Sequence, residues 1–271
     1  MRLLIGRFPP LLLLIGCMAS SFEVFTQSAG TSRETAVAKT GILVELFTSE
    51  GCSSCPPADQ LLRQLDLHTL AKGEQIVVLG EHVDYWDGTG WRDRFSSRDF
   101  TDRQAEYARR FNISGPYTPQ MVVDGTREFV GNDPRLLQSA LNDAASRPKA
   151  SITISWEEVG ATEIIAKIKV APLPQGAKHV DLYIALADNA DETQIGGGEN
   201  SGKLLKHVAA VRSLDKTARV GLQGIEKEVR FRIPKSVTAQ NLRVVAFVQE
   251  TNNGAVLGAA VKLLAGEVAI R

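Results

Sequence analysis

The sequence predicts an α/β domain followed by an all-β domain in a chain of 271 residues. Two observations predict this. Between residues 40 and 147, apolar segments with the length of strands alternate with segments whose apolar residues recur at helical spacing. Between residues 150 and 271, apolar residues recur at every second position and turn residues separate the segments. The stretch SRPKA, residues 146–150, marks the change between the two patterns.

Four segments in the first part have the β-branched and apolar composition of strands. They are GILVELF (41–47), QIVVLGEHV (75–83), YTPQMVVDG (117–125) and TREFV (126–130). The Asp-Gly pair between the last two is a hairpin turn signal.

Three predicted helices complete the first part. One begins near Pro56, because proline is tolerated in a first helical turn. A second begins at a capping box of Ser96 and Asp99, and a third has Pro134 at its first position after a capping aspartate. The resulting order, β-α-β-α-β-β-α, is the thioredoxin order, and we therefore predict a thioredoxin-like domain over residues 40–147.

The second part carries short strands and no helix of note. Its candidate strands are SITISW, EIIAKIKV, HVDLYIAL, LLKHVAAVRSL, KEVRFRIP and NLRVVAFVQ, and TNNGA is a hairpin signal. We predict an antiparallel β-sandwich domain over residues 150–271.

Residues 1–39 are predicted to be a signal peptide and a flexible leader. Arginines precede a short apolar run, residues 11–15, which is too short to span a bilayer. The tetrapeptide LIGC resembles a bacterial lipoprotein signal, in which Cys17 becomes a lipidated first residue; the alternative is ordinary cleavage after small residues such as Ala19. Either way we expect an exported protein, periplasmic or secreted, with membrane contact only through a lipid anchor at Cys17.

Composition excludes some partners. Apolar residues make up 44% and charged residues 23% of the chain, as in ordinary soluble globular proteins. Lysine and arginine together number 31, as do aspartate and glutamate, so the chain lacks the basic surplus of nucleic-acid-binding proteins. We expect no nucleic-acid partner.

Cys52 and Cys55 form the Cys-x-x-Cys motif that the mature fold retains, and an oxidising compartment allows them to form a disulfide. The motif precedes a predicted helix, whose free amide groups and dipole stabilise a thiolate. We expect Cys52 to be the more exposed and attacking sulfur and Cys55 the resolving one. Such exchange needs no cofactor.

Other chemistries for this pair stay open. A structural disulfide is one, although so short a loop constrains the unfolded chain little. A copper site of Cys52, Cys55 and His82 is another, because thiolates and imidazole suit that metal. His82 follows the second strand and lies on the same rim of the sheet as the cysteines, where it is also a candidate base.

Glu45 is a candidate proton carrier for the resolving thiol if burial in the first strand raises its pKa; the alternative is a solvent-facing side chain. The aromatic residues Tyr85, Trp86 and Trp91 either line a peptide groove or pack their loop onto the domain.

The stretch GGENSGKL, residues 197–204, fits a phosphate-binding pattern only superficially. Leu204 replaces the serine or threonine that would hold magnesium, and strands rather than a strand and a helix flank the stretch. We expect a hairpin loop and no nucleotide.

Several motifs occur in one order: VELFTSEGCSSCPPAD, HVDYWDGTGWRDRF, FTDRQAEYARRF, YTPQMVVDG and GENSGKLLKH. Together they resemble the bacterial exported family catalogued as domain of unknown function 1223, over residues 40–262. That family is similar to thioredoxin-like proteins and has no settled biochemical role.

The resemblance implies that a proline loop lies against the dithiol and that the Thr118-Pro119 bond is cis. Gly51, where related enzymes often carry an aromatic residue, and the two prolines after Cys55 depart from the thioredoxin pattern. We predict thiol–disulfide exchange with extracytoplasmic proteins. The alternatives are a non-catalytic binding module of the cell envelope and a copper-handling protein.

Overall fold

The computed structural model describes residues 40–159 and 162–264. The predicted signal peptide and leader, with Cys17, lie outside the described residues, so those predictions stay predictions. Within the described ranges, none of the helices is both long and apolar enough to cross a membrane.

The first part of the chain has the predicted order of strands and helices. Its elements are β1 (Gly41–Thr48), α1 (Pro56–Leu65), β2 (Gln75–His82), the 3-10 turn η1 (Asp84–Trp86), α2 (Arg98–Phe111), β3 (Gln120–Val123), β4 (Arg127–Val130) and α3 (Pro134–Ala145). Strand β1 is parallel to β2 and antiparallel to β3. The hairpin turn at Asp124 and Gly125 is confirmed, with φ angles of 48° and 63°.

The capping prediction for α2 was wrong by one residue. Ser97 caps this helix, because its side chain accepts a hydrogen bond from the Asp99 N–H. Ser96 instead donates its hydroxyl to Asp87 and to the Asp93 carbonyl. Asp133 caps α3.

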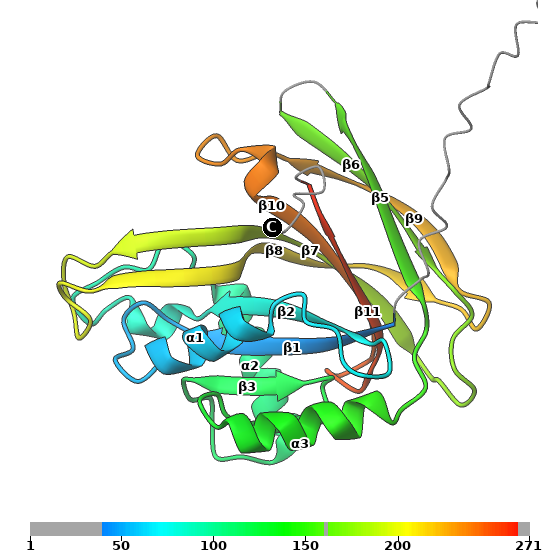
Figure 1. Ribbon diagram of the computed structural model, residues 1–271, viewed down its shortest axis with the longest axis horizontal. Coiled ribbons are helices and arrows are strands. Elements are labelled where there is room, and N and C mark those ends of the chain that lie inside the picture. Colours follow the sequence, from blue (N-terminus) through cyan, green and yellow to red (C-terminus); the bar gives the residue numbers. More distant parts are fainter. Residues whose placement is uncertain (1–39, 160–161, 265–271) are drawn as a thin grey trace, which may run out of the picture. The chain divides into compact units, whose positions relative to one another are not determined.

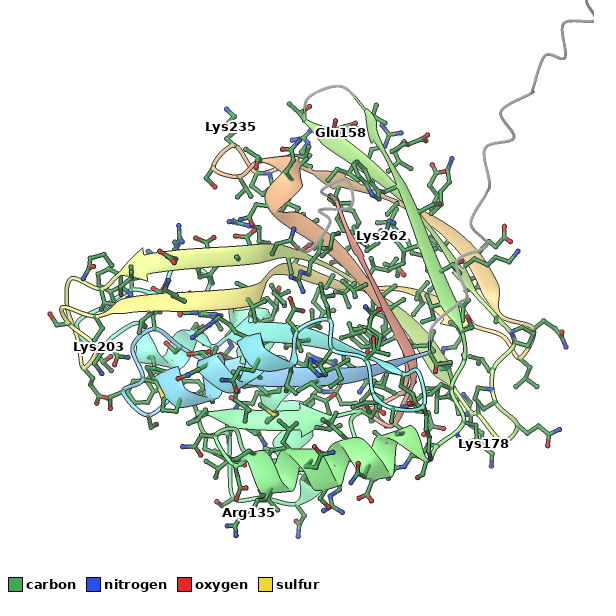
Figure 2. The ribbon with its side chains drawn as sticks, in the orientation of Figure 1. Arg135, Glu158, Lys178, Lys203, Lys235 and Lys262 are labelled. Atoms are coloured by element: carbon green, nitrogen blue, oxygen red, sulfur yellow. A yellow bond between two sulfur atoms is a disulfide. The ribbon has the colours of Figure 1, made fainter. Side chains whose placement is uncertain are left out.

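The second part consists of strands and one short 3-10 turn. Its elements are β5 (Ile152–Val159), β6 (Glu163–Val170), β7 (Val180–Gln194), β8 (Leu204–Val220), β9 (Ile225–Arg232), η2 (Ala239–Asn241), β10 (Leu242–Glu250) and β11 (Val256–Leu263). Strands β7 and β8 contain 15 and 17 residues and are much longer than predicted. They form a long hairpin, with Lys203 at its tip (Figure 2).

Both parts contribute strands to one sheet of eight, in the order β11-β10-β7-β8-β2-β1-β3-β4 (Figure 1). The parts join where Gly80 of β2 pairs with Ala210 of β8. The remaining strands form a separate sheet of three, in the order β5-β6-β9. The division into domains of residues 40–147 and 150–271 stays a prediction, although the shared sheet shows that the two parts are closely connected.

The apolar cores place helices on both faces of the β1–β2 sheet. Val44 and Leu46 pack with α1 and α3, whereas Leu43 and Phe47 face the other side, with residues of α2. Another cluster fills the space between the three-stranded sheet and strands β7 and β10. Side chains along β1 therefore alternate between the face covered by α1 and α3 and the face covered by α2, and only those on the first face point toward the helix that follows the cysteine motif.

Candidate functional site

Cys52 and Cys55 form a disulfide between the end of β1 and the start of α1. Cys55 is the residue before the first helical turn, and its carbonyl accepts hydrogen bonds from the Ala58 and Asp59 N–H groups. Pro56 follows within that turn, where the missing N–H has no intrahelical partner to lose. The helix therefore starts at the second cysteine, as the sequence indicates.

The expected exposure of Cys52 is not observed, because Cys52 and Cys55 are both 0% exposed. Neighbouring segments pack closely on the loop that carries them. A Cβ atom placed on Gly51 would lie 3.1 Å from the Trp86 Cβ, so a side chain at this position would require Trp86 to shift. The buried side chain of Asn200, from the β7–β8 hairpin, binds the same loop.

Thr118 and Pro119 lie beside this loop, and the predicted cis bond between them is confirmed. Trp86, whose Cβ and carbonyl oxygen lie against Gly51, donates from its indole a hydrogen bond of 2.8 Å to the Thr118 hydroxyl. A Cβ atom placed on Gly131 would lie 3.3 Å from the Pro119 Cβ and 3.2 Å from the Ala58 Cβ of α1. The proline loop thus borders the first turn of α1.

His82 is connected to the cysteine loop through Asp93. Its Nδ1 lies 2.6 Å from the Asp93 Oδ2, which also accepts a hydrogen bond of 2.8 Å from the Glu50 N–H. Burial disfavours the charged imidazole, but the carboxylates of Asp93, Asp59 and Glu50 together outweigh this and raise the pKa of His82. Burial also works against the Asp93 carboxylate, yet its contact with His82 and its backbone donors lower the pKa of Asp93 to about 2.

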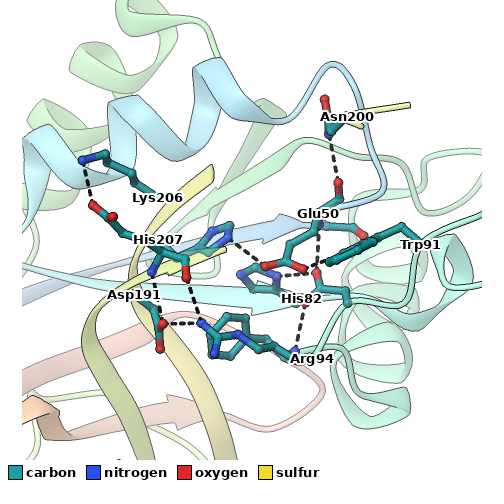
Figure 3. A network of polar contacts seen from close by, with 12 residues as sticks. Glu50, His82, Trp91, Arg94, Asp191, Asn200, Lys206 and His207 are labelled. Atoms are coloured by element: carbon teal, nitrogen blue, oxygen red, sulfur yellow. Dashed lines mark hydrogen bonds and ion pairs between the residues drawn. The ribbon is translucent and has the colours of Figure 1, made fainter. Parts of the chain in front are cut away.

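Glu50 joins this pair to a second histidine, as Figure 3 shows. Its carboxylate accepts a hydrogen bond of 2.8 Å from the Trp91 indole and lies 3.2 Å from the His207 Nε2. Burial raises the pKa of Glu50, but these contacts outweigh it and leave the pKa lowered. The ring centroids of His82 and His207 are 4.8 Å apart. The cysteine loop is thus connected to a buried network of acidic and imidazole side chains, those of Glu50, Asp93, His82 and His207.

Asp59 of α1 is a further buried acid near the disulfide, 7% exposed and one helical turn after Cys55. Burial raises the pKa of Asp59, and the nearby His207 and His82 only partly offset this. Asp59 borders a cleft of about 270 Å³ between α1 and the start of β8. A carboxyl group in this position can hold a proton and exchange it with solvent.

The structure places Glu45 in a different cluster. Its side chain is fully buried and accepts hydrogen bonds from Arg103 and Tyr107 of α2, at 2.7 and 2.6 Å. It therefore points to the α2 face of β1, whereas Leu46 faces α1. The predicted role of Glu45 as a proton carrier for Cys55 stays a prediction without a supporting contact.

Among residues 40–159 and 162–264, no group of three or more His, Cys, Asp or Glu side chains is placed to hold a metal ion. Both cysteine sulfurs are joined in the disulfide, so the copper alternative with Cys52, Cys55 and His82 concerns a reduced form of the chain. Trp86 and Trp91 use their indole groups to fix their loop onto the domain.

Sequence reasoning missed several residues of the site. They are Glu50, Asp59, Asp93, Asn200 and His207. All of them fall within motifs by which the chain resembles a known family, which was the available signal. The pattern could not show that Glu50 meets residues 150 or more positions away.

Comparisons with known proteins identify a family and a fold. A profile of the family described as "Protein of unknown function (DUF1223)" matches residues 43–249. A crystal structure of a protein from Agrobacterium tumefaciens shares 27% identity, covering 86% of this chain and 98% of that one, with a TM-score of 0.59. HBP35 of Porphyromonas gingivalis shares 14% identity over 86% of this chain and 78% of its own, with a TM-score of 0.57, which concerns the fold alone.

A domain of the outer membrane lipoprotein Omp28 from Porphyromonas gingivalis, with a TM-score of 0.26, is too distant to support an argument. No curated protein matches the chain.

Proposed function

The chain belongs to the family described as protein of unknown function (DUF1223), and we propose that it exchanges thiols and disulfides with extracytoplasmic proteins through Cys52 and Cys55. One observation carries the proposal: the two cysteines form a disulfide at the first turn of α1, and the Thr118-Pro119 segment borders that turn. A cysteine pair at a helix N-terminus is suited to cycle between a dithiol and a disulfide.

We assign the first part of the chain to the thioredoxin-like superfamily and the second to a β-sandwich. The order of elements from β1 to α3 supports the first assignment. The apolar cluster between the three-stranded sheet and strands β7 and β10 supports the second. We further propose that the chain is exported, anchored by a lipid at Cys17 or released by ordinary cleavage, as its first residues predict.

The proposed exchange passes two electrons directly between the chain and its partner and needs no cofactor. In the reduced chain, the Cys52 thiolate attacks a partner disulfide, forms a bond to one partner sulfur and releases the other as a thiolate. The Cys55 thiolate then attacks the Cys52 sulfur, which forms the intramolecular disulfide and releases the second partner thiolate. Two electrons pass to the partner, and the reverse sequence oxidises a partner dithiol. We assign Asp59 as the acid that takes up or returns the proton of Cys55.

Replacing Cys55 by serine is expected to trap the partner. Without the resolving thiol, the mixed disulfide between Cys52 and a partner accumulates. The variant would be expressed in a cell with an exported protein complement, quenched with acid and alkylated, and its adducts identified by non-reducing electrophoresis and mass spectrometry. The matched control is Cys52→Ser, which retains Cys55 and is expected to trap far less. Equal, negligible adducts from both variants would argue against exchange.

Burial of both sulfurs favours a second candidate function. A disulfide closed off from solvent is typical of a structural bridge, and the chain would then be a non-catalytic binding module of the envelope. In that case Cys55→Ser should leave partner binding unchanged and trap no adduct.

A further inference from the structure

The tip of the β7–β8 hairpin, residues 195–203, lies over the cysteine loop, and we call it the lid. Its backbone closes on itself, because the Gly202 N–H donates to the Ile195 carbonyl and the Ile195 N–H donates to the Lys203 carbonyl. Gly198 and Gly202 have φ angles of 69° and 83°, which glycine adopts without steric cost. The lid is thus a formed turn and contains the glycine-rich stretch that the proposed exchange chemistry does not use.

Asn200 fastens the lid to the cysteine loop. Its side-chain amide donates two hydrogen bonds, each of 2.9 Å, to the carbonyls of Glu50 and Cys52, and the residue is 0% exposed. Lys203 donates to the Asn200 Oδ1 at 2.9 Å and so fixes the orientation of the amide. At the exposed rim, the Ser53 N–H donates to the Glu199 carboxylate at 3.1 Å. The lid therefore binds the backbone on both sides of the first sulfur.

The glycines of the lid allow it to lie directly on the loop that carries Trp91. A Cβ atom placed on Gly197 would lie 2.4 Å from the Gly90 carbonyl oxygen, and one on Gly198 would lie 3.2 Å from the Trp91 Cβ. The first distance is too short for any side chain at Gly197. Because these glycines have no side chains, the lid approaches the Trp91 loop closely without side-chain contacts of their own. The hydrogen bonds of Asn200 and Glu199 to the cysteine loop therefore fix its position.

We propose that the lid closes over the Cys52–Cys55 disulfide and must lift before a thiol can attack it. This inference rests on the proposed exchange function. A nucleophile has to reach a sulfur along the disulfide axis, and both sulfurs are fully covered. Neutral hydrogen bonds each shift an equilibrium by only about fivefold, so the two bonds of Asn200 make opening unfavourable without preventing it. Opening frees two carbonyls and the Ser53 N–H, which the backbone of a protein partner can pair.

The test is the rate at which a small phosphine, tris(2-carboxyethyl)phosphine, reduces the disulfide of the full chain. Thiols formed over time are alkylated and counted by intact mass, and no biological partner is needed. Asn200→Ala is expected to speed reduction about tenfold or more, because loss of two hydrogen bonds raises the open population. The matched control is Asn189→Ala. Asn189 lies on the same hairpin and also bridges two carbonyls, those of Gln240 and Leu242, but it does not touch the cysteine loop.

Glu199→Ala supplies a second variant, which removes only an exposed contact and is expected to speed reduction about twofold to fivefold. If Asn200→Ala does not fold, the reduction rate of Glu199→Ala alone tests the proposed lid. Unchanged reduction rates in the lid variants, or an equal acceleration by Asn189→Ala, would contradict the proposal that the lid must lift before the disulfide is attacked. If the lid variants are faster but Cys55→Ser traps no partner, the lid stands and the exchange function fails.

Discussion

Replacing Arg103 by methionine is expected to lower the free energy of unfolding by about 3–5 kcal/mol, the range found when one partner of a buried ion pair is removed. Arg103 is 8% exposed, and its guanidinium binds the fully buried Glu45 through Nε, at 2.7 Å, and through Nη2, at 2.5 Å. Burial lowers the pKa of Arg103, but Glu45, Tyr107 and Glu81 together outweigh it, so the pKa is raised and the guanidinium stays charged. Methionine would leave the Glu45 carboxylate without its counter-ion in the core.

The same guanidinium also connects the two parts of the chain. It donates to Gln249 of β10 and to Asn253 in the β10–β11 turn, at 3.0 and 3.1 Å. Urea unfolding at pH 7 measures the effect. Arg98→Met on the same helix is the control, because its exposed ion pair with Asp102 contributes at most about 0.5 kcal/mol. A loss below about 1 kcal/mol for Arg103→Met would contradict this account of the buried cluster.

Replacing Glu81 by glutamine is expected to stabilise the protein at alkaline pH and to have little effect in acid. Burial, and then repulsion from Glu45, raise the pKa of Glu81 well above its ordinary value of 4.5, and Arg103 offsets only part of this. Neither carboxyl oxygen of Glu81 has a hydrogen-bond partner within the described part of the chain. The folded protein therefore holds this proton more tightly than the unfolded chain does.

The sign of the pH dependence follows from that difference. As the pH rises above about 4.5, the unfolded chain ionises Glu81 while the folded chain does not, so stability falls by up to about 1.4 kcal/mol per pH unit until the folded pKa is passed. Glutamine has no proton to lose and removes this decline. Urea unfolding at pH 5 and pH 8 tests it, with the exposed Glu106→Gln on α2 as control. An equal difference between variant and wild type at both pH values would refute the raised pKa.

Local patterns along β1, α2 and α3 were sufficient to predict the first part of the fold. A buried strand, a capped helix and an Asp-Gly turn each depend on neighbours within a few residues, so the sequence shows them directly. The pairing of β2 with β8 depends on residues 130 positions apart, Gly80 and Ala210, and no local signal reveals it. That pairing is the reason why the two parts share one sheet.

The same limit applied to the candidate site. Spacing and helix position identified the cysteine pair, and the family resemblance added the cis proline, both of which the structure contains. The sequence predicts Glu45 as a proton carrier for Cys55 if its strand buries it; the side chain is buried, but the alternation of β1 turns it toward Arg103. The stretch with Asn200 was predicted only as a hairpin loop that binds no nucleotide, because no local pattern shows that folding brings that loop onto Cys52.

The equilibrium reduction potential of Cys52–Cys55 decides whether the pair exchanges with partner thiols or forms only a structural disulfide. The protein would be equilibrated across a series of thiol buffers, quenched by alkylation and scored by mass spectrometry. Working dithiols span roughly −270 to −120 mV, and structural disulfides lie below about −300 mV. We expect a potential inside the working range. A potential well below about −300 mV would contradict the exchange function and make the pair a structural bridge beneath its lid.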